Sequence, residues 1–180
     1  RQRPRRSYRV MAAVLPRAAA TLVLLRPAGG GSEVLMIQRA QNAAFLGGAY
    51  VFPGGALDDA DSDARSFRRV AGLTDMEASA RLGVPQKGLA YWVAAVRECF
   101  EEAGVLLGVS REGNLIPPRR AEEPEGSRKS SFGEMLEQAD LYIPGDRVAY
   151  YGHWITAPGR SRRSDTRFFV AQAPEGQEGA

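Results

Sequence analysis

Residues 97–105 read RECFEEAGV, and residues 50–61, well upstream, read YVFPGGALDDAD. The first stretch ends an apolar segment with helical periodicity, so we expect a helix over Leu89–Ala103. Gly104 follows directly, at the position where a left-handed residue commonly ends a helix. The second stretch carries Pro-Gly-Gly at 53–55, which predicts a turn after a short strand. These two segments hold the residues on which both the fold and the function depend.

Three glutamates crowd one side of the expected helix. At about 100° per residue, Glu98, Glu101 and Glu102 share an arc of about 100° opposite the apolar face. Like charges three or four residues apart repel one another, so the cluster is either a solvated face or a site where a cation offsets the repulsion. Mg²⁺ prefers oxygen ligands and is commonly held by a few carboxylates together with substrate phosphates. Arg97 is placed to pair with one glutamate and hold it in position.

Composition limits the class of protein. With 180 residues, 44% of them hydrophobic, the chain suits one compact domain. It has no apolar run of about 18 residues, so we expect no membrane span. The only cysteine, Cys99, cannot form an internal disulfide, which fits a reducing compartment. We expect a cytoplasmic protein of bacterial type, and the sequence leaves an organelle open because it has no Ser-Lys-Leu terminus to decide the matter.

The positive charge is concentrated at the start of the chain. The arginines at positions 1, 3, 5, 6 and 9 carry more positive charge than the net +3 of the whole chain, so the rest of the chain is slightly acidic. We therefore expect residues 1–10 to form a basic arm without fixed structure, which becomes an upstream-start artefact if Met11 is the initiator. Nucleic-acid binding would depend on this arm alone and is a minor alternative.

Apolar runs and helix signals alternate irregularly along the chain, which predicts a mixed-sheet α/β fold. Thr74 and Glu77 have the spacing of a capping box, and Gly83 is placed to end the helix that follows them. The expected strands are 18–25, 33–39, 49–52, 105–107, 147–156 and 166–171, and the expected helices are 75–82, 89–103 and 131–138. The first two strands, joined by a Gly-rich loop, predict an antiparallel hairpin.

The two opening segments together resemble the Nudix hydrolase signature, GX5EX7REUXEEXGU, where U is aliphatic. Gly55 takes the place of the leading glycine and Asp61 that of the first glutamate. Residues 97–105 match the second half, with Cys99 at the first aliphatic position. Residues 62–96 separate the two halves where the signature has seven residues. We therefore interpret 62–87 as an insertion within a single domain, 11–180, in which 117–130 form a charged surface loop.

The resemblance implies an α/β/α sandwich, here without its last strand and helix, and hydrolysis of a diphosphate linked to another group. It assigns Glu98, Glu101 and Glu102 as catalytic ligands of Mg²⁺ or Mn²⁺, with main-chain help from Gly54 and Gly55. Arg97 becomes a catalytic-site residue and Asp61 an uncertain one. Glu175 and Glu178 are weak candidates for a further carboxylate late in the chain.

The segment before the signature resembles the pattern of coenzyme A diphosphatases in this family. Residues 35–55 match it at Leu35, Met36, Arg39, Ala40, Gly48 and Phe52–Gly55, whereas Ala44 replaces an expected arginine. This resemblance implies a coenzyme A-like substrate, with Arg39, Gly48 and Phe52 as candidate binding residues. The loss of an arginine at position 44 leaves NADH or ADP-ribose as alternatives, and the Asp at 61 leaves nucleotide binding without hydrolysis.

Several other residues allow a functional interpretation but favour a structural one. His153, the only histidine, lies in a strand pattern beside Trp154, and Cys99 lies at the edge of the apolar helix face. Arginines at 160, 162, 163 and 167 could contact phosphate, although most of them fit a solvated turn. A homodimer is compatible with the sequence.

Overall fold

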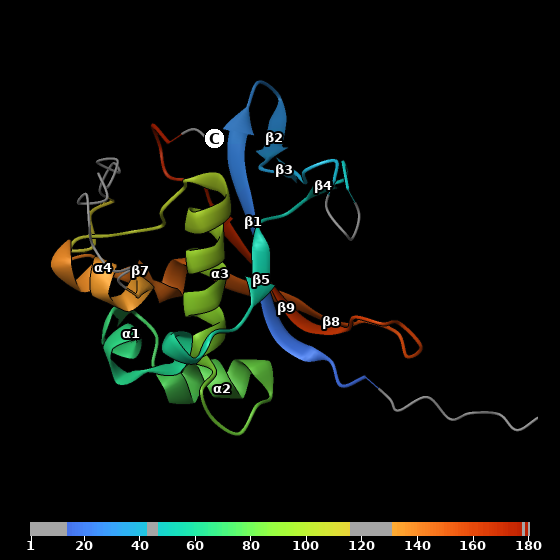
Figure 1. Cartoon of the computed structure of the whole chain (residues 1–180). Coiled ribbons are helices and arrows are strands. Elements are labelled where there is room, and N and C mark those ends of the chain that lie inside the picture. Colours follow the sequence, from blue (N-terminus) through green and yellow to red (C-terminus); the bar gives the residue numbers. More distant parts are fainter. Residues whose placement is uncertain (1–13, 43–46, 116–130, 178, 180) are drawn as a thin grey trace, which may run out of the picture.

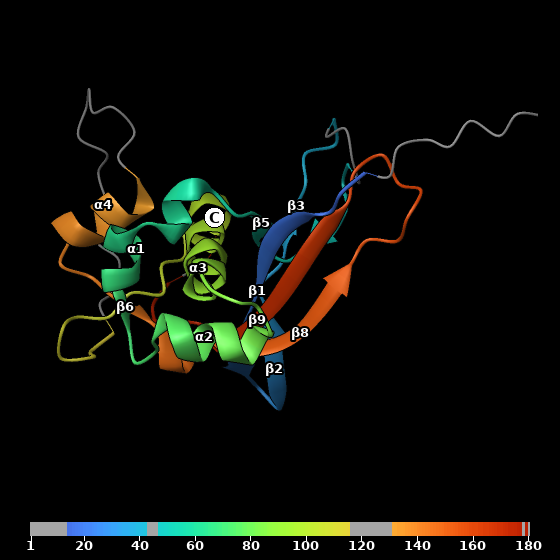
Figure 2. The same cartoon turned by 90° about the horizontal axis from the view of Figure 1, so that it is seen from below.

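The computed structural model describes residues 14–42, 47–115, 131–177 and 179. They form a mixed β-sheet with helices packed on one face, and Figures 1 and 2 show the sheet on one side and the helices on the other. The predicted arm (1–10) and charged loop (117–130) lie outside the described residues, as do Ala44 and Glu178. The mixed-sheet α/β fold is confirmed, and the second helical layer of the expected sandwich is not among the described residues.

Strand β1 (Arg17–Ala28) runs through the centre of the sheet. One edge of β1 pairs in parallel with β9 (Ser164–Gln172), which pairs antiparallel with β8 (Ala149–Ile155). The other edge pairs antiparallel with two short strands, β5 (Gly54–Ala56) near its start and β2 (Gly31–Val34) near its end. The predicted β1–β2 hairpin is therefore confirmed.

Three strand predictions need correction. The run over 33–39 breaks at Leu35, and β3 (Ile37–Gln38) pairs instead with β4 (Tyr50–Val51). Pro-Gly-Gly at 53–55 is no turn, because Gly54 and Gly55 lie in β5, where pairing with β1 supplies the partners that an extended glycine needs. Residues 105–107 form a buried loop: the Leu106 N–H donates to the Gln177 side chain, and the Leu106 carbonyl accepts from Gln177 Nε2 and from the Gly108 N–H.

The helices follow the predicted boundaries closely. α3 (Leu89–Ala103) ends at Gly104, whose φ of 68° is left-handed, and α2 (Asp75–Leu82) starts at the predicted capping box, in which Thr74 and Glu77 bond each other's backbone. α4 (Phe132–Gln138) starts at Ser131. The remaining short elements were not predicted: η1 (Asp59–Ser62), α1 (Ala64–Arg68), β6 (Val70–Ala71), β7 (Ile143–Pro144) and η2 (Gly145–Arg147).

The core lies between α3 and the inner face of β1 and β9. Alternate β1 residues Ala20, Leu22 and Leu24 face the helix and are buried, as the period-two pattern of a strand requires. Trp92 and Phe169 are fully buried, with ring centroids 4.6 Å apart. The packing of these buried side chains fixes the rotation of α3 about its axis. That rotation decides which side chains of α3 face β5.

Candidate active site

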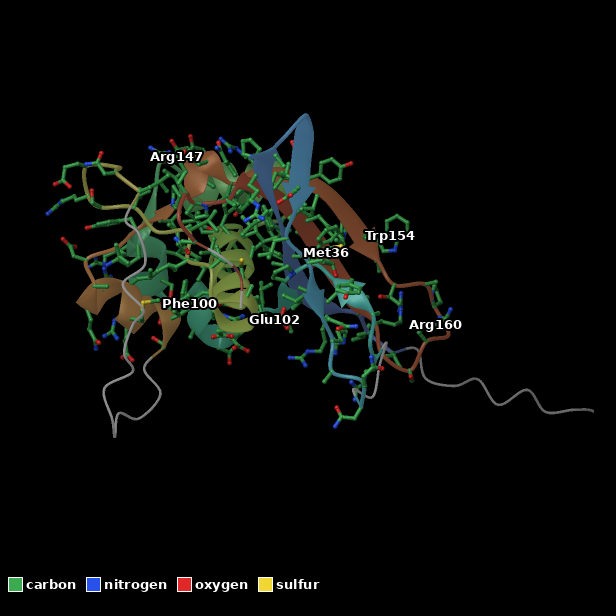
Figure 3. All side chains as sticks on the ribbon, turned by 90° about the horizontal axis from the view of Figure 1, so that it is seen from above. Met36, Phe100, Glu102, Arg147, Trp154 and Arg160 are labelled. Carbon is green, nitrogen blue, oxygen red and sulfur yellow. The ribbon has the colours of Figure 1, made fainter. Side chains whose placement is uncertain are left out.

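The apolar side of α3 is buried in the core, so its glutamates project toward β5 and solvent. Glu98 is nearly buried, with 14% of its side chain exposed, whereas Glu101 is 53% exposed. Figure 3 labels Glu102 near the end of α3. The predicted separation of an apolar and an acidic helix face is confirmed, and the acidic face splits into one buried and one solvated part.

Two glycines of β5 lie directly against these carboxylates. The Gly54 N–H donates to Glu102 Oε2 at 3.0 Å. A Cβ on Gly55 would lie 2.4–2.6 Å from the carboxylate atoms of Glu98, so only glycine leaves room for that side chain. Strand β5 and helix α3, far apart in sequence, thus bring Glu98 and Glu102 to adjacent peptides of one strand.

Arg97 connects the acidic face to Asp61. Its Nε and Nη2 donate to the two Asp61 oxygens at 2.8 and 3.0 Å, and Nη2 also donates to the Ala56 carbonyl. Its Nη1 donates to Glu98 at 2.8 Å and to Glu101 at 3.0 Å. The guanidinium therefore pairs with two glutamates of α3, where the sequence predicted one.

Asp61 is 1% exposed and accepts a third bond from the Asp58 N–H. This carboxylate holds Arg97 and caps the start of η1, so it acts here as a positioning residue. Burial alone would lower the pKa of Arg97, but the bonds and charge of Asp61 outweigh that effect and raise it. Neither the role of Asp61 nor that of the Ala56 carbonyl could be found from the sequence, because residues 62–96 separate the partners.

The electrostatics of the site suit a hard cation. Burial raises the pKa of Glu98; Arg97 opposes this shift, and Glu102 and Glu101 add to it. The three carboxylates supply the oxygen donors that Mg²⁺ or Mn²⁺ prefers, and Gly55 leaves room for that of Glu98. Within the described part of the chain, no three His, Cys, Asp or Glu side chains are already arranged as a ligand set. Because Arg97 holds Glu101, coordination of a metal ion by all three glutamates would require the Glu101 carboxylate to turn.

Comparisons with known proteins found similar sequences and a similar solved structure. No protein-family model matches the chain. It resembles acyl-coenzyme A diphosphatase NUDT19 of Homo sapiens, with 31% identity over 80% of the chain, and that of Gallus gallus, with 29% over 77%. A solved structure, a NUDIX hydrolase from Alicyclobacillus acidocaldarius, superposes with a TM-score of 0.72 and 29% identity, covering 93% of this chain and 74% of that one. In sequence and in fold, the chain thus resembles Nudix hydrolases.

The match to the diphosphatases is partial in length. The chain spans about half the length of the curated relatives, 48% of the human protein and 47% of the avian one. None of the helices in the described ranges is long and apolar enough to cross a bilayer. The predicted homodimer and the predicted compartment stay predictions.

The candidate substrate residues lie on the β3–β4 hairpin and next to β5. Arg39 exchanges backbone bonds with Ala49 and Gly48, and Gly48 has a φ of 77°, which favours glycine. The Arg39 Nε is buried and has no hydrogen-bond partner among the described residues. Phe52 is half-buried immediately before Pro53. The structure thus places an incompletely bonded guanidinium on the hairpin that leads into the site.

The remaining candidates lie outside the carboxylate site. Cys99 is fully buried in the core, and its burial, with a smaller effect of Glu102, raises the pKa of the thiol to about 12. His153 contacts Asp165, which also pairs with Arg167, a buried residue under the Tyr91 ring. Arginines 160, 162 and 163 lie in or beside the β8–β9 turn, and Glu175 is exposed.

Gly55→Ala should lower the turnover number for a diphosphate substrate by about 100-fold, because the new methyl group must displace Glu98 and misplacement by about 1 Å can cost that much. Gly152→Ala is the matched control, since it also lies in a strand but its Cβ would meet nothing within 4 Å. Steady-state kinetics of both variants check this prediction. Equal activities would show that the Gly55–Glu98 contact is unimportant.

Glu98→Gln should stabilise the metal-free protein near neutral pH. A raised carboxyl pKa in the folded state means that Glu98 contributes stability below its ordinary pKa of 4.5, and that this contribution is lost as pH rises through the raised value. The neutral amide avoids this loss. In EDTA, the variant should melt above the wild type at about pH 8, and the difference should shrink toward about pH 4. A variant that melts lower at about pH 8 contradicts the assignment.

Proposed function

We propose that the chain catalyses divalent-metal-dependent hydrolysis of the diphosphate bond in coenzyme A or acyl-CoA. The products are adenosine 3′,5′-bisphosphate and phosphopantetheine or its acyl derivative. The observation that carries the proposal is the placement of Glu98 and Glu102 against Gly54 and Gly55 of β5. The naming of the relatives as acyl-coenzyme A diphosphatases supports the substrate.

Different residues of the acidic site have different roles in the proposed reaction. Glu98, Glu101 and Glu102, with the main chain at Gly54 and Gly55, would hold Mg²⁺ or Mn²⁺, which when bound offsets the negative charge of a diphosphate and activates water. Arg97 orients Glu98 and Glu101 through its Nη1. A carboxylate of this cluster accepts the proton of the attacking water.

Arg39 is the proposed contact for a substrate phosphate. A guanidinium matches phosphate oxygens in a bidentate manner, and the Arg39 Nε lacks a partner in the described residues. Gly48 and Phe52 shape the same hairpin. Together these residues would hold the substrate while the carboxylates of α3 face its diphosphate.

The test is an activity panel with and without Mg²⁺ or Mn²⁺. Coenzyme A, acetyl-CoA, NADH, ADP-ribose and dinucleoside polyphosphates are incubated with the protein, and the products are identified by mass spectrometry. Release of adenosine 3′,5′-bisphosphate from coenzyme A, only with metal, is expected. Turnover of NADH or ADP-ribose alone would replace the substrate but keep the reaction class, and metal-dependent binding without turnover would contradict hydrolysis.

A further inference from the structure

A cavity of about 370 Å³ lies beyond the end of α3, a volume within the range of small-molecule sites. Its walls come from β1, the β2–β3 connection, the loop after α3 and the last described segment. The side chains that matter below are Leu24, Leu35, Met36, Val105, Ala173 and Gln177. Its rim carries Arg26 and Glu33, which pair at 2.7 Å.

The cavity follows the carboxylate site along the same edge of β1. Gly54 pairs with Thr21, whereas the Leu35 N–H donates to the Leu24 carbonyl, three residues further along the strand. At about 3.3 Å per residue, this separates the two places by about 10 Å. Val105, in the cavity wall, comes three residues after Glu102. Figure 3 labels Met36 on the segment after β2 and Glu102 near the end of α3.

The last described segment forms a fixed wall of the cavity. The Ala173 N–H donates to the Leu25 carbonyl at 2.7 Å. The Gln177 amide both accepts from the Leu106 N–H and donates to its carbonyl, at 2.9 and 3.0 Å. These bonds join the segment to β1 and to the loop after α3, so the cavity is formed before any ligand arrives.

The chemistry of the lining excludes two parts of the substrate. Among the described residues, no aromatic side chain lines the cavity, so these residues offer no stacking surface for adenine. The one arginine among the described lining residues, Arg26, pairs with Glu33, so the rim carries no net positive charge from this pair to attract a phosphate group. What remains is an aliphatic and thioether surface with a polar rim, which suits a flexible chain of methyl, methylene and amide groups.

We infer that this cavity binds the pantetheine arm of the substrate while its diphosphate lies at Glu98 and Glu102. The inference rests on the proposed function and adds to it a second subsite and the direction in which the substrate lies. The arm carries geminal methyl groups and two amides, which match an aliphatic pocket with a polar rim. Adenosine bisphosphate then lies outside this cavity, and Arg39 is the proposed contact for one of its phosphates.

The test compares Met36→Trp with Met76→Trp. Met36 lines the cavity and is 42% exposed, so a larger ring blocks the cavity with little risk to folding. Met76 on α2 is 80% exposed and is the matched control. Met36→Trp should raise KM for coenzyme A and the inhibition constant of phosphopantetheine about tenfold. It should leave kcat and inhibition by adenosine 3′,5′-bisphosphate within twofold, and the control should change none of these.

Calorimetric titration with phosphopantetheine separates this inference from the proposed function. Binding that weakens in Met36→Trp supports the subsite even if the wild type does not hydrolyse coenzyme A. If the wild type hydrolyses coenzyme A but Met36→Trp binds phosphopantetheine as the wild type does, the subsite is overturned and the function stands. Equal weakening toward phosphopantetheine and adenosine 3′,5′-bisphosphate also overturns it, because the effect is then not confined to one arm.

Discussion

Glu98→Gln should reduce the turnover number for coenzyme A by about 1,000-fold, the upper range for loss of one electrostatic contact in an active site. The amide keeps the shape of the side chain but cannot serve as an anionic ligand or accept a proton. Because Glu98 lies nearly buried against Gly55, no neighbouring carboxylate can take its exact position. Initial rates with saturating metal measure the effect, and thermal unfolding shows that the variant is folded.

Glu112→Gln is the matched control for this experiment. Glu112 is exposed in the loop after α3, and its side chain bonds only to Ser110 among the described residues, so the same change of charge should leave the rate within twofold. A rate for Glu98→Gln within tenfold of the wild type would show that Glu98 is no part of the catalytic site.

Asp61→Asn should lower the free energy of unfolding by about 3 kcal/mol, since it breaks a buried ion pair and leaves the Arg97 charge with only Glu98 and Glu101 as hydrogen-bonded carboxylate partners among the described residues. Asp61 is 1% exposed and bonded twice to Arg97, whose own side chain is 7% exposed. Such a loss is a large part of the 5–15 kcal/mol typical of a domain. Urea unfolding followed by circular dichroism measures it.

The control is Asp59→Asn, two residues earlier on the same turn. Asp59 is exposed, and its side chain makes no hydrogen bond or ion pair recorded among the described residues, so the change should stay within about 0.5 kcal/mol. If both variants unfold at the same urea concentration, the Asp61–Arg97 pair does not hold η1 against α3.

The parts of the fold that could be predicted from the sequence are those that local patterns determine. The apolar periodicity of α3 and the glycine at 104 predicted both ends of this helix correctly, and the Thr74–Glu77 spacing predicted the start of α2. The acidic face could be predicted for the same reason, because the angles between residues of one helix are fixed. The family signature then linked this face to the glycines upstream.

The parts that could not be predicted depend on contacts between distant segments. Pro53-Gly54-Gly55 has the composition of a turn, and only pairing with β1 makes Gly54 and Gly55 a strand. The apolar residues 105–107 have the composition of a strand, but in the described part of the chain the Leu106 main chain bonds to the Gln177 side chain and not to a neighbouring strand. Asp61 has no local signal for burial, since its partner Arg97 lies on another element. The cavity at Met36 combines four separate segments and has no sequence pattern.

Binding of Mn²⁺, followed by electron paramagnetic resonance, tests most directly whether the acidic face of α3 is a cation site. We expect the wild-type protein and Glu112→Gln to bind Mn²⁺ alike, and Glu98→Gln to bind it at least tenfold more weakly. Equal Mn²⁺ affinity in all three proteins would contradict a cation site on this face.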